Sequence, residues 1–143
     1  MTEAQISLVQ QSFAVVKPMG DLAASMFYTR LFHLEPGLQP LFRTEPREQG
    51  RKLMSMLAVA VNGLSRLEQI LPAVEELGRR HAHYGVRDEH YSTVGAALLW
   101  TLEQGLGSGF TAEVRSAWES AYELLASAMQ GAAADAQAAT IAA

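Results

Sequence analysis

The chain has 143 residues, of which 49% are apolar and 18% charged, so it is long enough for one domain with a core and lacks the composition of a disordered chain. A formal net charge of −4 without a basic cluster argues against nucleic acid and anionic membranes as partners, and the absence of Cys excludes disulfides, thiolate metal sites and iron–sulfur clusters. Because no N-terminal stretch reads as a secretion signal and no apolar run approaches the roughly 20 residues that span a bilayer, we expect a cytoplasmic protein.

The first half of the chain predicts three helices with apolar residues at helical spacing. Each has a recognisable start signal: the capping box of Thr2 to Gln5, the cap Asp21, and Pro46 at a first helical position. The breaks between them contain Pro and Gly: Pro18, Gly20 and Pro36-Gly37. A short apolar piece that ends at Phe42 precedes the third helix, and Gln49 lies one turn before Leu53 at the head of that helix's apolar stripe.

The second half predicts three more helices, which start at Pro72, Asp88 and Thr111. The last of them is expected to end near Gly131. Residues 132–143 are mostly Ala without a large apolar anchor, so they would extend the helix weakly or fray in solution. We therefore divide the chain into a folded domain over 1–131 and an Ala-rich, disorder-prone C-terminal tail over 132–143. No stretch alternates with period two, so the predicted class is all-α.

One of the four histidines stands out by its position. His33, His83 and His90 are interpreted as surface or hydrogen-bonded residues, whereas His81 shares an apolar helix face with Leu77. His83 points to nearly the opposite side, so it cannot share a metal with His81. An inward imidazole needs a buried partner or a metal, and one ring nitrogen suffices for iron when a porphyrin supplies four further ligands. The sequence thus favours haem over zinc at His81.

Several short motifs occur in a fixed order: Met26 to Phe32, Gly78 to His81, His90 to Gly95, Ala117-Trp118 and Ala121-Tyr122. Over roughly residues 2–130 this order resembles the bacterial haemoglobins, above all single-domain globins and the globin part of flavohaemoglobins. The resemblance implies a globin fold of about seven to eight helices packed around haem b. It also implies His81 as the proximal iron ligand, Phe42 as the ring that wedges against the haem, and a distal pocket made by Tyr28, Gln49 and Leu53.

The resemblance extends to the proximal side. Tyr91 matches a residue that in flavohaemoglobins contacts the proximal histidine together with a glutamate on the last helix. The place of that glutamate falls near Ala133 here, so the hydrogen bonding that makes the imidazole more electron-donating is expected to be missing. Peroxidase-like chemistry is therefore less expected than ligand binding.

The implied function is reversible, high-affinity binding of oxygen and of related gases such as nitric oxide and carbon monoxide. Tyr28 and Gln49 are donors that stabilise a ligand with partial negative charge, and Leu53 would restrict access to very small molecules. The alternative is a nitric oxide dioxygenase, which would depend on a separate reductase because the 143 residues leave no room for a flavin or nicotinamide domain. A haem-based gas sensor is ranked last, since a sensor needs an output element.

Overall fold

The computed structural model describes residues 1–142, and its side chains are described up to Ala138. The described chain contains six α-helices: α1 (Glu3–Val16), α2 (Gly20–Leu34), α3 (Pro46–Gly63), α4 (Leu67–His83), α5 (Asp88–Leu106) and α6 (Ala112–Ala142). Short 3-10 segments join them: Lys17–Met19, Pro36–Leu41, Leu64–Arg66 and Gly107–Gly109. Residues 1–142 contain no strand, so the predicted all-α class is confirmed.

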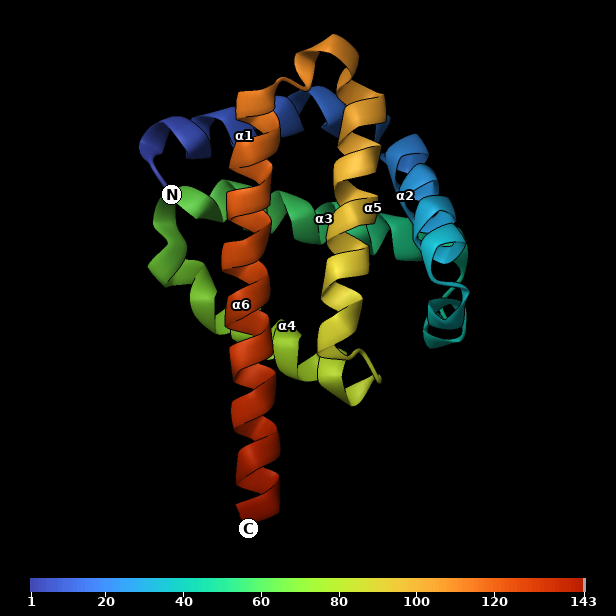
Figure 1. The fold of residues 1–143 in the computed structure, drawn as a ribbon, viewed down its shortest axis with the longest axis vertical. Coiled ribbons are helices and arrows are strands. Elements are labelled where there is room, and N and C mark those ends of the chain that lie inside the picture. The colour runs from blue at the N-terminus through green and yellow to red at the C-terminus, as the bar shows by residue number, and fades with distance from the viewer. Residues whose placement is uncertain (143) are drawn as a thin grey trace.

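The helices pack crosswise around one shared core (Figure 1). α5 and α6 run side by side in opposite directions, α1 and α3 cross behind them, α2 lies at one side and α4 crosses near the lower end of α5. The most deeply buried core residues come from α1, α2, α5 and α6: Val9, Leu31, Ala97 and Ala117. No helix within residues 1–142 is both long and apolar enough to cross a membrane.

Three of the predicted helix starts are confirmed by their capping contacts. The Thr2 hydroxyl accepts the backbone N–H of Gln5 in a complete capping box at the start of α1. Pro46 is the first residue of α3, and the Thr111 hydroxyl accepts the N–H of Val114 at the start of α6. These starts were predictable because each depends on residues within one turn of the helix end.

Two predicted caps are wrong. Asp21 does not cap α2, because the chain passes through a single 3-10 turn and α2 already begins at Gly20. Asp88 is the first residue of α5 rather than its cap, because Arg87 occupies that place and its backbone N–H donates to Nδ1 of His90 at 2.9 Å. The ring of His90 thus accepts the N–H of the residue that precedes the helix, a contact different from the carboxylate cap that was expected.

The predicted start of α4 at Pro72 is also wrong, since the helix begins five residues earlier at Leu67. Tertiary packing explains the earlier start: a Cβ at Gly63 would lie only 2.5 Å from the side chain of Ile70. Ile70, in the first turn of α4, is therefore seated directly on the end of α3. The stabilisation from this contact offsets the loss of the backbone hydrogen bond that Pro72, inside α4, cannot donate.

The C-terminal helix is longer than predicted. α6 continues through Gly131 to Ala142, which is consistent with the high helix propensity of Ala, and Ala132 is 5% exposed. The expected end near Gly131 is therefore wrong as a helix boundary. The division into a domain over 1–131 and a tail over 132–143 stays a prediction.

A buried hydrogen bond joins the first and last helices. The indole N–H of Trp118 on α6 donates to the hydroxyl of Ser12 on α1 at 2.8 Å, and that hydroxyl donates to the carbonyl of Leu8 at 2.6 Å. Trp118 is 3% exposed and Ser12 is 8% exposed, so water cannot easily replace either partner. This contact therefore fixes the position of α1 relative to α6.

Ser12→Ala should lower the free energy of unfolding by about 1–3 kcal/mol, because it leaves the buried indole N–H of Trp118 without an acceptor. Urea denaturation measures this change. Ser25→Ala, at an exposed position on α2, is the control and should change little. In a double-mutant cycle, Trp118→Phe should reduce the cost of Ser12→Ala, and fully additive losses would contradict the proposed pairing.

Candidate functional site

A close crossing of α2 and α3 brings two polar side chains of the predicted distal pocket together. A Cβ at Gly50 would lie 3.0 Å from the Cβ of Ala24, so the two helices approach closely there. Tyr28 lies one turn beyond Ala24, and Gln49 directly precedes Gly50. As a result, the side-chain amide of Gln49 donates to the hydroxyl oxygen of Tyr28 at 3.4 Å.

Aromatic rings hold the Tyr28 side chain in place. The ring of Phe42 meets it edge-on at a centroid distance of 5.3 Å, and that of Phe32 stacks on it at 6.0 Å. Burial raises the pKa of Tyr28, and the hydrogen bond from Gln49 lowers it by less. The hydroxyl therefore keeps its proton, and because its oxygen accepts from Gln49 it can donate that proton to a further group.

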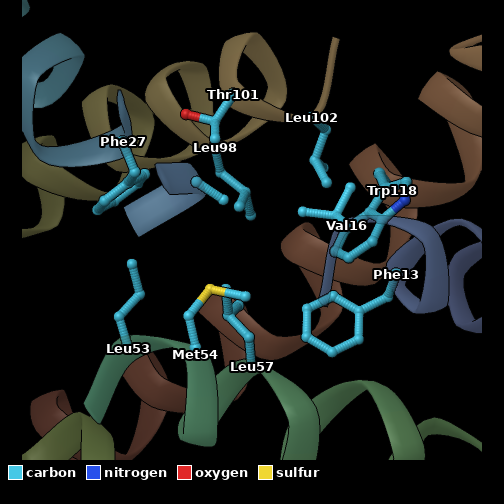
Figure 2. A pocket seen from close by; sticks show the side chains of 11 residues that line it. Phe13, Val16, Phe27, Leu53, Met54, Leu57, Leu98, Thr101, Leu102 and Trp118 are labelled. Atoms are coloured by element: carbon cyan, nitrogen blue, oxygen red, sulfur yellow. The ribbon is translucent and has the colours of Figure 1, made fainter. Parts of the chain in front are cut away.

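Leu53 lies three residues after Gly50 on α3. Its side chain helps to line an internal cavity of about 20 Å³. Figure 2 shows Leu53, Met54 and Leu57 pointing from α3 toward Phe27 and the side chains of α5. The remaining labelled lining residues come from α1, α5 and α6: Phe13, Val16, Leu98, Thr101, Leu102 and Trp118. The cavity wall is apolar, apart from Thr101, whose hydroxyl donates to the carbonyl of Ala97 at 2.8 Å.

His81 lies on α4 and is only partly buried. Its Nδ1 is 2.8 Å from the carbonyl oxygen of Leu77, and because a carbonyl can only accept, Nδ1 carries the proton. Burial lowers the pKa of His81, which the bond to Leu77 only partly offsets. The ring is thus neutral with its lone pair on Nε2, the form in which histidine binds a metal. By contrast, His83 is exposed, as predicted.

α6 contacts both helices that carry the predicted proximal residues, α4 with His81 and α5 with Tyr91. A Cβ at Gly78 on α4 would lie 2.2 Å from the backbone oxygen of Met129, so the backbones of α4 and α6 are in direct contact one turn before His81. The hydroxyl of Tyr122 on α6 donates to the backbone carbonyl of Tyr91 on α5 at 2.6 Å. Burial, and to a smaller extent the charge of Asp88, raises the pKa of Tyr91. A contact between Tyr91 and His81 stays a prediction.

Sequence reasoning missed a polar cluster that joins the end of α2 to the start of α5. Glu35 accepts a hydrogen bond from the hydroxyl of Thr93 at 2.8 Å and lies 3.1 Å from Nε2 of His90. His90 is 8% exposed, so it is one of the few buried polar residues of the described chain. The sequence left open whether His90 is a surface residue or a hydrogen-bonded one, and the structure shows the second; its partner Glu35 is too distant in sequence for periodicity to reveal.

The donor set limits the kind of metal that the described residues could hold. Among residues 1–138, no group of three or more His, Asp or Glu side chains is arranged to bind an ion. His81 would contribute one nitrogen alone. Such a site needs a metal whose other ligands arrive with it, which is the situation in a metalloporphyrin.

Comparisons with known proteins agree with this arrangement. A family model described as Globin matches residues 25–129. Flavohemoproteins of Bacillus subtilis and Bordetella parapertussis are 30% and 32% identical over 129 and 128 residues, which make up 88% and 87% of this chain and 32% of each relative. The chain therefore spans about one third of the length of the curated relatives that it matches.

Two solved structures share the whole architecture. A bacterial globin from Campylobacter jejuni superposes with a TM-score of 0.83 at 25% identity, covering 95% of this chain and 99% of the other. An engineered carbene transferase, described as a candidate nitric oxide dioxygenase from Rhodothermus marinus, gives a TM-score of 0.88 at 25% identity and covers 99% of both chains.

Proposed function

Because the chain belongs to the globin family, which implies a haem cofactor, we propose that it binds haem b through His81 and takes up oxygen reversibly with high affinity. The observation that carries the proposal is the hydrogen bond from Gln49 to Tyr28. It orients the Tyr28 hydroxyl as an acceptor toward Gln49 and leaves its proton for a ligand. Nitric oxide and carbon monoxide are further gases of suitable size.

The residues present fit a haem. His81 offers one neutral imidazole nitrogen, and the remaining contacts that a porphyrin needs are apolar. Phe42, Leu53 and Val94 pack against the core but are only partly buried, so each has apolar surface to offer to a flat ring. When bound, the haem iron supplies the atom to which a gas can attach.

The chain's own side chains then determine which ligand is retained. The Tyr28 hydroxyl donates to a ligand atom that carries partial negative charge, and Gln49 holds that hydroxyl in place. Phe42 and Leu53 exclude water, which strengthens the hydrogen bond and restricts access to small apolar molecules. His81 keeps its orientation through the carbonyl of Leu77 rather than through a carboxylate, which favours ligand binding over peroxidase-like chemistry.

Tyr28→Phe tests this function, because it keeps the ring and its contact with Phe42 but deletes the donor. A hydrogen bond to a charged group is worth about 1.5–3 kcal/mol, so oxygen should dissociate about 10- to 100-fold faster. Stopped-flow displacement of oxygen by carbon monoxide measures the rate. The affinity for carbon monoxide should change less, since that ligand gains little negative charge.

The controls separate the hydroxyl from general disturbance of the protein. Tyr84→Phe removes a hydroxyl from a side chain that is 64% exposed and should leave oxygen dissociation unchanged. Gln49→Leu should act in the same direction as Tyr28→Phe but more weakly, and the double variant should be non-additive. An unchanged oxygen off-rate in Tyr28→Phe would mean that the proposal is wrong and that Tyr28 is an ordinary core residue.

Nitric oxide dioxygenase activity is the second candidate, because the matching neighbour from Rhodothermus marinus is described in these terms and the curated relatives are flavohemoproteins. The reaction joins one nitric oxide and one dioxygen to give nitrate, and one electron is required for each turnover. That electron has to be supplied by a reductase. Nitrate formation sustained over many turnovers with a reductase present, compared with a single turnover without it, would establish this activity.

A further inference from the structure

The side of α3 that faces away from the core has an unusual composition. Two rows of side chains run along it with helical spacing, and all of them are exposed: Arg47, Arg51, Ser55 and Val59 in one row, and Glu48, Lys52 and Met56 in the other. We refer to these seven residues as the outer face of α3. Six of them, all except Arg47, also line a shallow hollow on the surface of this helix.

The N-terminal half of the outer face carries an excess of positive charge. It has three cations and one carboxylate, although the whole chain has a formal net charge of −4. Lys52 lies 3.9 Å from Glu48, but within residues 1–138 no carboxylate lies within ion-pair distance of Arg47 or Arg51. The nearby carboxylate of Glu45 accepts the backbone N–H groups of Arg47 and Glu48, and the charges of Arg47 and Arg51 also contribute to lowering its pKa. Neither guanidinium group is in an ion pair with a described carboxylate, so both can contact an anionic partner.

The C-terminal half of the same face is apolar. Met56 is 37% exposed and Val59 is 60% exposed, and both belong to the small set of large hydrophobic side chains that the chain leaves open to solvent. A cationic region that steers an approaching partner, beside apolar side chains that it can bury, is the usual composition of a protein-docking surface.

The position of the outer face relates it to the site. Leu53 packs against the core on the inward side of the same helix, and Gln49 lies at the boundary between that side and the outer face. Because an α-helix with its side chains is about 10–12 Å across, a partner docked on the outer face would lie about one helix diameter from the distal residues. An electron donor docked there would approach the haem site from the side of the distal residues.

We propose that the outer face of α3 docks an acidic electron-donor protein with a flavin or iron–sulfur centre. This inference rests on the proposed function, since the donor passes one electron to the ferric iron of the bound haem and is itself oxidised by one electron, and no bond forms or breaks. Arg47 and Arg51 attract acidic side chains of the donor, and Met56 and Val59 are buried against it.

The experiment uses the haem-loaded ferric protein and reduced flavodoxin, an acidic flavoprotein, as the probe. Reduction is followed by stopped-flow absorbance at several salt concentrations. At low salt, R47E/R51E should reduce the second-order rate constant at least about 10-fold, and added salt should then raise the rate constant instead of lowering it, because the face now repels the acidic donor. K17E/R66E is the matched control, because it reverses two exposed cations on other segments, and it should change the rate less than about 2-fold. Val59→Ser should slow reduction at high salt as well.

A second set of measurements separates this proposal from its premises and its rivals. Reduction by chemically reduced riboflavin, a small electron donor that is itself reoxidised, should be equal in all variants, which shows that the haem site is intact. A protein that binds no haem would instead contradict the proposed function. Equal slowing by R47E/R51E and K17E/R66E would overturn the proposal in favour of a general charge effect. Two further outcomes would also overturn the proposal. If sedimentation shows concentration-dependent dimers that R47E/R51E abolishes, the outer face of α3 binds a second copy of the chain. If the protein binds phosphatidylserine vesicles and R47E/R51E abolishes that binding, the face binds a membrane surface.

Discussion

Replacement of His81 by alanine should abolish stable haem uptake. His81 is a partly buried imidazole with Nδ1 bound to the carbonyl of Leu77, so Nε2 is the atom that would bind iron. Alanine removes that bond, and within residues 1–138 no cluster of three or more metal-binding side chains is available instead. Haem titration followed by gel filtration measures the retained haem, and the variant should also lose the thermal stabilisation that a ligand of the folded state provides.

His83→Ala is the matched control, because His83 lies two residues further along α4 and is exposed. It should retain haem like the original protein. His90 is unsuitable for this purpose, since it is 8% exposed and its ring accepts the N–H of Arg87 at the start of α5. Full haem occupancy with an unchanged Soret band in His81→Ala would show that the proximal ligand has been assigned to the wrong residue.

Gly78→Ala should destabilise the fold by about 3 kcal/mol or more. The added Cβ would lie 2.2 Å from the backbone oxygen of Met129, and a backbone atom cannot rotate away as the end of a side chain can. α4 and α6 must therefore separate. This separation also displaces His81, which lies about one turn after Gly78 on α4. Urea denaturation gives the loss in stability, and haem titration should show weaker binding.

Gly131→Ala provides the comparison, because it introduces the same methyl group into α6 where nothing lies within 4 Å. Alanine is a better helix former than glycine by roughly 1 kcal/mol, so this variant should be slightly more stable than the original protein. The two variants should thus change stability in opposite directions. Similar stabilities for both would contradict the close crossing of α4 and α6.

The sequence predicted the helix ends that depend on local chemistry and missed those that depend on packing. The capping box at Thr2 and the start at Pro46 involve residues within one turn, and both are confirmed. The start of α4 was misplaced because Ile70 packs on Gly63, a contact between two helices that no local pattern contains. The cap of α5 was misassigned to Asp88 although its chemistry is local: Arg87 takes the cap position, and its backbone N–H donates to the ring of His90.

The candidate site was predictable in its residue types but not in its geometry. Spacing placed His81 on an apolar helix face, and the structure agrees that it is partly buried beside Leu77. The meeting of Tyr28 with Gln49 could not be derived from spacing, because it depends on the close approach of α2 and α3 at Gly50. The sequence analysis missed the cations on the outer face of α3, because they are separated in the sequence and share a face only when the helix forms. The expectation of no basic cluster was therefore incomplete.

The internal cavity beside Leu53 has a consequence for the volume of the protein. Its roughly 20 Å³ corresponds to about 12 mL per mole of void that unfolding would fill, a modest addition to the volume changes of −20 to −100 mL/mol usual for small proteins. The hydroxyl of Thr101 is already bonded to the carbonyl of Ala97, so little polar surface remains to hold a water molecule there. Hydrostatic pressure therefore acts against the folded state at this point of the core, where α1, α3, α5 and α6 meet.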